Sequence, residues 1–169
     1  MRGDITREQV DAIVNAANSL LLGGGGVDGA IHAAAGPKLL EECRRIRKTT
    51  HRDGLPVGEA VTTGGYDLPS RWVIHTVGPN RNRGETDPEL LASCFRSCLA
   101  EARRVGARSI AFPAISAGAY GWDVAEVARI AVSTVREEVS DDDTIELVRF
   151  VLFDARAVAA FESALASGA

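Results

Sequence analysis

Short apolar runs alternate along the chain with longer stretches in which apolar residues recur at helical spacing. The runs are rich in β-branched residues and predict strands, and the longer stretches predict helices between them. The predicted strands cover residues 10–15, 59–63, 72–77, 108–113 and 144–153.

Helix starts are marked by proline and by N-cap residues. A short helix of small residues is expected over residues 29–35, and Gly36-Pro37 ends it and starts the next. Asp87-Pro88 begins a long helix with apolar residues on one stripe. Asp123 and Asp154 are predicted N-caps, and Glu126 is expected to complete a capping box with Asp123. The inward positions of the helix from Pro37 are predicted to be Leu39, Leu40, Cys43 and Ile46.

This alternation of strands and helices predicts one α/β domain over residues 1–169, with a largely parallel sheet between helix layers. No linker, repeat or low-complexity tract divides the chain. In such sheets ligands bind at the carboxyl ends of the strands, so the loops that follow strands are where a site is expected.

Composition narrows the class of protein. The formal net charge of −4 argues against a general nucleic-acid binder, and no apolar run is long enough for a transmembrane helix.

Three cysteines without C-x-x-C spacing indicate reduced thiols in a cytoplasmic protein. Cys94 and Cys98 fall on the buried stripe of the long helix, so core packing is favoured over a metal pair. A monomer is expected.

Residues 23–26 are four consecutive glycines that follow a predicted strand and precede a predicted helix. Glycines here allow the backbone to turn sharply and approach a ligand, and a helix N-terminus offers unpaired N–H groups to an anion. Gly24, Gly26 and Gly29 fit the G-x-G-x-x-G pattern of dinucleotide-binding folds only formally. The strand ends near Asn15, which is too early for that fingerprint, and this disfavours a dinucleotide-dependent oxidoreductase.

Two loops, residues 15–29 and 114–122, follow strand ends and contain no Lys or Arg. If they hold phosphate, they hold it with backbone N–H groups and helix dipoles. The alternative is that both are tight turns required for packing. The basic residues at 44–48 are interpreted as a solvated helix end rather than a phosphate site.

Five short segments along the chain belong together. They are G-D-I-T at 3–6, N-A-A-N at 15–18, G-G-G-G-V-D-G-A-I-H at 23–32, V-I-H-T-V-G-P at 73–79 and F-P-A-I-S-A-G-A-Y-G at 112–121. Taken together and in order, they resemble a macrodomain of the MacroD type over essentially the whole chain. The resemblance implies a three-layer α/β/α fold with a mostly parallel mixed sheet that binds ADP-ribose. It also implies hydrolysis of mono-ADP-ribose esters on acidic side chains and deacetylation of O-acetyl-ADP-ribose.

The resemblance assigns roles to individual positions. Asn18 and Asp28 match the catalytic pair, in which the asparagine orients the distal ribose and the aspartate serves hydrolysis. Asp4 and Ile5 match the adenine contacts, and Phe153 matches an aromatic residue that stacks near adenine. The remaining substrate-binding positions are Gly25, Gly26, Val27, Ser116, Ala117, Gly118, Ala119 and Tyr120. No cofactor and no metal are implied; the partners are ADP-ribose and ADP-ribosylated substrates.

Three departures from the family pattern are present. Only Met1 and Arg2 precede G-D-I-T, so either the sheet lacks an edge strand or the start is truncated. Ala117 stands where threonine is more common. Trp122-Asp123 stands where the family more often has Y-P, so Trp122 could narrow the distal pocket.

The same residues also fit structural interpretations and a second function. Asp28 is also a good N-cap for a helix starting at Gly29. Asn15 is expected to satisfy local backbone. His32 is expected to be a buried, hydrogen-bonded histidine rather than part of a dyad or metal site, and His75 is expected in the core. The alternative function from another class is a non-catalytic ADP-ribose reader.

Overall fold

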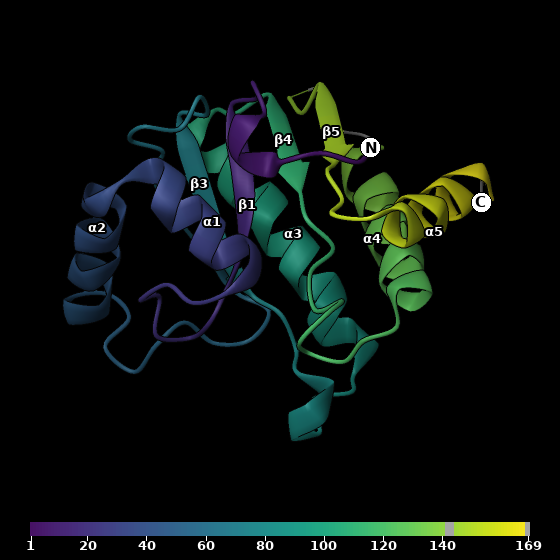
Figure 1. Cartoon of the computed structure of the whole chain (residues 1–169), viewed down its shortest axis with the longest axis horizontal. Helices are drawn as coiled ribbons and strands as arrows, with labels where there is room; N and C mark the ends of the chain where they lie inside the picture. The colour runs from purple at the N-terminus through teal and green to yellow at the C-terminus, as the bar shows by residue number, and fades with distance from the viewer. Residues whose placement is uncertain (141–143, 168–169) are drawn as a thin grey trace.

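Strand β1 (Ala12–Ala17) is the central strand of a mixed sheet in the computed structural model, which describes residues 1–140 and 144–167. The strand order is β2-β3-β1-β4-β5. β2 runs antiparallel to β3, whereas β3, β1, β4 and β5 run parallel to one another. The expected mostly parallel mixed sheet is therefore confirmed (Figure 1). The other strands are β2 (Ala60–Gly64), β3 (Trp72–Val77), β4 (Ser109–Phe112) and β5 (Leu147–Phe150).

Helices cover both faces of this sheet, which confirms the three-layer α/β/α architecture. In Figure 1, α1 lies in front of the sheet with α2 at the left, α3 passes behind the sheet, and α4 and α5 lie together at the right. Two single turns, η1 (Ile5–Arg7) and η2 (Arg81–Arg83), complete the elements. The helices are α1 (Gly26–Ala35), α2 (Pro37–Lys48), α3 (Pro88–Val105), α4 (Val124–Val139) and α5 (Ala155–Ala166).

Alternation along the strands divides the apolar side chains between two cores. On β1, Ile13 packs with the residues beneath α1 and α2, whereas Val14 packs with Phe95 and Phe112 on the side of α3. Each of these side chains is 0% exposed. Fully burying a side chain of this size contributes about 1.5–3 kcal/mol, so the sheet holds its strands, and the loops at their ends, in fixed positions.

The predicted helix caps are largely confirmed. The side chains of Asp87, Asp123 and Asp154 accept hydrogen bonds from backbone N–H groups of α3, α4 and α5. The capping box at Asp123 is only half formed. Glu126 directs its carboxylate to Arg81, 3.1 Å away, because that guanidinium offers a charged partner.

The largest differences from the predicted element boundaries are in β1, α1 and β5. β1 runs to Ala17, because Ala16 and Ala17 pair with β3 despite the weak strand preference of alanine. α1 begins at Gly26, not near Gly29. β5 ends at Phe150, since beyond it Leu152 donates its N–H to the Met1 carbonyl instead of to β4. The predicted acidic turn at 141–143 lies outside the described residues.

The first residues lie along the outer edge of this last strand. Arg2 forms an isolated parallel bridge with Leu152, and the Met1 ammonium donates to the Phe150 carbonyl at 2.8 Å. This pairing places the G-D-I-T segment beside residues 152–153.

Candidate functional site

The two loops singled out in the sequence lie at the same edge of the sheet. The glycine loop, residues 18–25, follows β1, and the second loop, residues 113–123, follows β4. β1 and β4 are adjacent parallel strands, so their carboxyl ends, and the loops that leave them, are neighbours. This is the edge where ligands of parallel sheets are expected.

The glycine loop leads directly into a helix with an open N-terminus. Gly25 is the N-cap of α1, and no side chain caps the helix. The first N–H groups of a helix have no partner within it, and those of Gly26 and Val27 donate to no other described residue. An anion placed here would meet free donors and the positive end of the helix dipole.

Different glycines of this segment are required for different reasons. Gly23 and Gly26 have φ angles of 85° and 60°, a region that favours glycine. Gly29 packs against the preceding loop so closely that a Cβ there would lie 2.4 Å from the Gly24 carbonyl oxygen. Around Gly25, by contrast, a Cβ would meet no atom within 4 Å. The loop is therefore held close to α1 while its outer side stays open.

Asp28 is a buried carboxylate in the first turn of α1. It is the third residue of the helix, and Gly25 is the N-cap, so the N-cap interpretation of Asp28 is wrong. Its side chain accepts a 2.7 Å hydrogen bond from Asn15 and lies 3.5 Å from His32 Nε2. Burial raises the pKa of Asp28, against the hydrogen bond from Asn15 and the nearby His32, which lower it. A carboxylate of raised pKa is a better proton acceptor.

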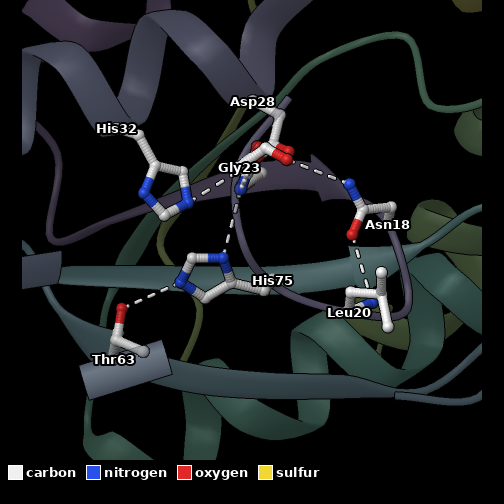
Figure 2. A network of polar contacts seen from close by, with 8 residues as sticks. Asn18, Leu20, Gly23, Asp28, His32, Thr63 and His75 are labelled. Carbon is white, nitrogen blue, oxygen red and sulfur yellow. Dashed lines mark hydrogen bonds and ion pairs between the residues drawn. The ribbon is translucent and has the colours of Figure 1, made fainter. Parts of the chain in front are cut away.

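Asn15 and the two histidines complete this cluster; Figure 2 shows His32 and His75 beside Asp28. Asn15 Nδ2 also lies 3.1 Å from His75 Nδ1, so Asn15 serves side chains of the site and not local backbone, contrary to the prediction. His32 is half-buried, and its Nε2 lies 3.5 Å from Asp28 Oδ1 but is buried without a hydrogen-bond partner, so the expected hydrogen-bonded histidine is wrong at this atom. His75 is fully buried, as predicted.

Asn18 shapes the glycine loop. Its Oδ1 accepts from the Leu20 N–H at 3.1 Å, and its Nδ2 donates to the Gly23 carbonyl at 3.1 Å (Figure 2). Asn18 and Asp28 converge at Gly24, where a Cβ would lie 3.5 Å from Asn18 Nδ2 and 3.3 Å from Asp28 Oδ2. The structure thus brings the two predicted catalytic residues together, with only a glycine between them.

The second loop presents free backbone donors. The N–H groups of Gly118, Ala119 and Tyr120 donate to no described residue. Ser116 opens the loop in a left-handed conformation, φ 68°, and donates its hydroxyl to the Pro79 carbonyl at 2.8 Å. Such strain in a non-glycine residue is typical of functional loops. The helix that follows is capped by Asp123, so this loop can offer N–H groups but not an open helix end.

Two residues of the β3–α3 connection hold the second loop in place, a contact that sequence reasoning missed. The N–H of Arg81 donates to the Tyr120 carbonyl at 2.9 Å, and Asn82 Nδ2 donates to the Ala119 carbonyl at 2.9 Å. Because the Ala119 carbonyl is engaged with Asn82, the Tyr120 N–H of the same planar trans peptide points the opposite way and has no described partner.

Trp122 does not line the loop's open side. It is 3% exposed and packs in the core beneath α3 and α4, with the Arg81 guanidinium 4.2 Å above its ring. The expectation that Trp122 narrows the distal pocket is therefore wrong. Its size and apolar surface favour the core over the loop's solvent side. Ala117 also packs against this core.

The predicted adenine contacts lie together at the β5 edge. The Gly3 N–H donates to the Leu152 carbonyl, which brings Asp4 and Ile5 alongside Phe153. Phe153 is 91% exposed. Asp4 accepts hydrogen bonds from the N–H and hydroxyl of Thr6, which hold the pKa of its carboxyl below the usual range. The β5 edge therefore carries an exposed aromatic ring and an ionised carboxylate, each one residue beyond the Gly3–Leu152 hydrogen bond.

The three cysteines lie in the two apolar cores. Cys43, Cys94 and Cys98 are buried free thiols, and burial raises the pKa of Cys43 to about 12 and of Cys94 to about 11.

Among residues 1–140 and 144–167, no cluster of three or more His, Cys, Asp or Glu side chains is arranged to hold a metal ion. No helix in the same residues combines the length and apolar character needed to cross a membrane.

Comparisons with known proteins agree with this arrangement. The family model described as Macro domain matches residues 14–131. A Macro domain-containing protein of Streptomyces coelicolor is 56% identical over 165 residues, covering 98% of this chain and 96% of that protein. The Oceanobacillus iheyensis macrodomain solved with ADP superposes with a TM-score of 0.94 at 46% identity, over 98% of this chain and 88% of that one. The Trypanosoma brucei macrodomain in complex with ADP-ribose gives a TM-score of 0.88 at 42% identity, over 97% and 67% of the two chains.

Proposed function

Because this chain belongs to the Macro domain family, we propose that it binds ADP-ribose between its two loops and hydrolyses esters of the distal ribose. The substrates are mono-ADP-ribose esters on acidic side chains and O-acetyl-ADP-ribose. The related macrodomains solved with ADP and ADP-ribose support the choice of ligand.

The ligand's diphosphate is held by backbone groups. The open N-terminus of α1 supplies N–H donors from Gly26 and Val27, and the second loop supplies those of Gly118, Ala119 and Tyr120. Neither loop contains Lys or Arg. At the other end of the ligand, the exposed ring of Phe153 stacks on adenine, and Asp4 accepts from the adenine amino group.

The observation that carries the hydrolase assignment is the Asp28 carboxylate, buried in the first turn of α1 beside Asn18. An anion-binding loop does not need a carboxylate, because negative charge near a diphosphate is unfavourable. As a base, however, Asp28 takes a proton from water as that water attacks the ester. The ester C–O bond breaks, Asp28 gives its proton to the leaving ribose oxygen, and the products are free ADP-ribose and the carboxylic acid. Asn18 orients the distal ribose for this attack.

The test is direct hydrolysis. The chain is incubated with a protein carrying mono-ADP-ribose on glutamate and, separately, with O-acetyl-ADP-ribose, and free ADP-ribose is measured by chromatography. Release from both substrates, together with calorimetric binding of ADP-ribose, supports the proposal. Binding without release identifies a reader and contradicts the hydrolase assignment. Absence of binding contradicts both functions.

A further inference from the structure

A line of polar side chains crosses the apolar core beneath α1 and α2. Asn15 on β1, His75 on β3 and Thr63 on β2 are 0%, 0% and 1% exposed. Each strand is otherwise apolar on this face. The residues two positions away, all packed in the core under α1 and α2, are Ile13, Ala17, Val73, Val77 and Val61.

The hydrogen bonds along this line have one consistent direction. The amide nitrogen of Asn15 donates to Asp28 Oδ1 and lies 3.1 Å from His75 Nδ1. An amide nitrogen can only donate, so His75 Nδ1 is the acceptor and the ring proton is on Nε2. His75 Nε2 therefore donates to Thr63 Oγ1 at 2.9 Å, and that hydroxyl donates to the Gly64 carbonyl at 3.2 Å.

The direction of these hydrogen bonds decides which atom of the Asn15 amide faces the Asp28 carboxylate. With the ring proton on Nε2, the Asn15 amide turns its nitrogen toward the Asp28 carboxylate (Figure 2 shows the ring between Thr63 and this carboxylate). If the ring proton were on Nδ1, the amide would reverse and place its oxygen against Asp28 Oδ1. Two acceptors facing one another in a buried site would disfavour the ionised carboxylate.

We propose that Thr63 and His75 are positioning residues: they fix the direction of the Asn15 amide and so hold the Asp28 carboxylate in place and ionised. The consequence for turnover rests on the hydrolase function proposed above, but the hydrogen-bond direction itself does not.

Packing alone does not account for this line. A buried polar network is costly unless satisfied, and apolar residues of similar volume would serve the core at least as well. This network ends at the one buried carboxylate of the site. Burial lowers the pKa of His75 to about 3, with a further contribution from His32. Near neutral pH the ring therefore stays neutral and keeps Nδ1 as an acceptor.

The test compares Thr63→Val, which removes the hydroxyl, with Thr63→Ser, which keeps it. In protein labelled with ¹⁵N-histidine, NMR distinguishes the Nε2–H tautomer from the Nδ1–H tautomer. The His75 signal is assigned by its absence from His75→Gln. We expect the Nε2–H form in the parent and in Thr63→Ser, and a shift toward Nδ1–H in Thr63→Val. An Nδ1–H ring in the parent overturns the proposal.

The same variants test the consequence for Asp28. In Thr63→Val the Asp28 carboxyl loses its donor, so its pKa should rise, as followed by ¹³C carboxyl shifts. The single-turnover rate should fall by up to about 100-fold relative to Thr63→Ser, with ADP-ribose affinity unchanged. A parent-like tautomer and Asp28 pKa in Thr63→Val overturn the proposal. If the parent chain hydrolyses no ester, only the proposed hydrolase function is contradicted. The His75 tautomer and the Asp28 pKa, both measured by NMR, still test the direction of the hydrogen bonds.

Discussion

The amide of Asn15 on β1 donates a 2.7 Å hydrogen bond to the carboxylate of Asp28 in the first turn of α1. This bond joins the central strand to the open helix end and holds a charged group in a place where burial opposes its charge. The ionised Asp28 carboxylate therefore lowers folding stability. Replacing it with a neutral side chain measures that cost.

Asp28→Asn should stabilise the fold near neutral pH. The folded-state pKa of Asp28 is raised above its unfolded value, so ionisation destabilises the folded state as pH rises through that pKa. Asparagine removes this penalty and still accepts from Asn15. Thermal melts should show a higher melting temperature for the variant at about pH 7 and a smaller gain near pH 4. A gain that grows toward acid pH would contradict the raised pKa.

Much of the fold is predictable from sequence because its signals are local. Proline and aspartate mark the starts of α3, α4 and α5, and β3 runs over the residues predicted, Trp72–Val77, because β-branched residues dominate that run. β1 is misplaced by two residues at each end, since only pairing with β3 makes strand of Ala16 and Ala17. The helix at the glycine loop begins earlier than predicted, because glycine suppresses the helical signal.

The candidate site was only partly predictable from sequence, because part of it depends on how the strands pair. Asn18 and Asp28 lie in two neighbouring motifs, but the line from Asp28 to Thr63 depends on which residues face each other across three strands. That register is a property of the sheet. The available signal is one polar residue at an inward position in each of three apolar strands, at Asn15, His75 and Thr63.

Gly24 and Gly29 should respond differently to alanine. In Gly24→Ala the methyl group meets the side chains of Asp28 and Asn18 at 3.3 and 3.5 Å, and these can move slightly. In Gly29→Ala it meets a backbone oxygen at 2.4 Å. We expect Gly24→Ala to melt close to the parent and to hydrolyse more slowly, and Gly29→Ala to melt at lower temperature. Equal turnover in Gly24→Ala and the parent would show that the two side chains do not act at this point.

Phe153→Ala should separate binding from stability. The ring is 91% exposed, so its loss removes little packing and the melting temperature should stay unchanged. Loss of stacking on adenine should weaken ADP-ribose binding by about 1–3 kcal/mol, the usual value for a base on an aromatic ring. Calorimetry checks the affinity. Unchanged binding would place adenine elsewhere.

Asp4→Asn tests the other adenine contact without disturbing the local turn. Asparagine can still accept from the Thr6 N–H and hydroxyl through Oδ1, but it replaces the second carboxylate oxygen with a donor. Facing the adenine amino group, that donor should weaken binding by about 1–3 kcal/mol. The melting temperature serves as the control. An affinity equal to the parent's would remove Asp4 from the adenine site.

The most direct test of the central claim pairs two measurements on Asp28→Asn: calorimetric affinity for ADP-ribose and single-turnover hydrolysis of a glutamate-linked ADP-ribose ester. Asp28 is not the cap of α1, so the substitution leaves the helix start intact. If Asp28 is the base, turnover should fall by about 10²–10⁴-fold. Binding should be retained or tightened, because a negative charge near the diphosphate is removed. Hydrolysis by Asp28→Asn at the parent rate would contradict this role of Asp28.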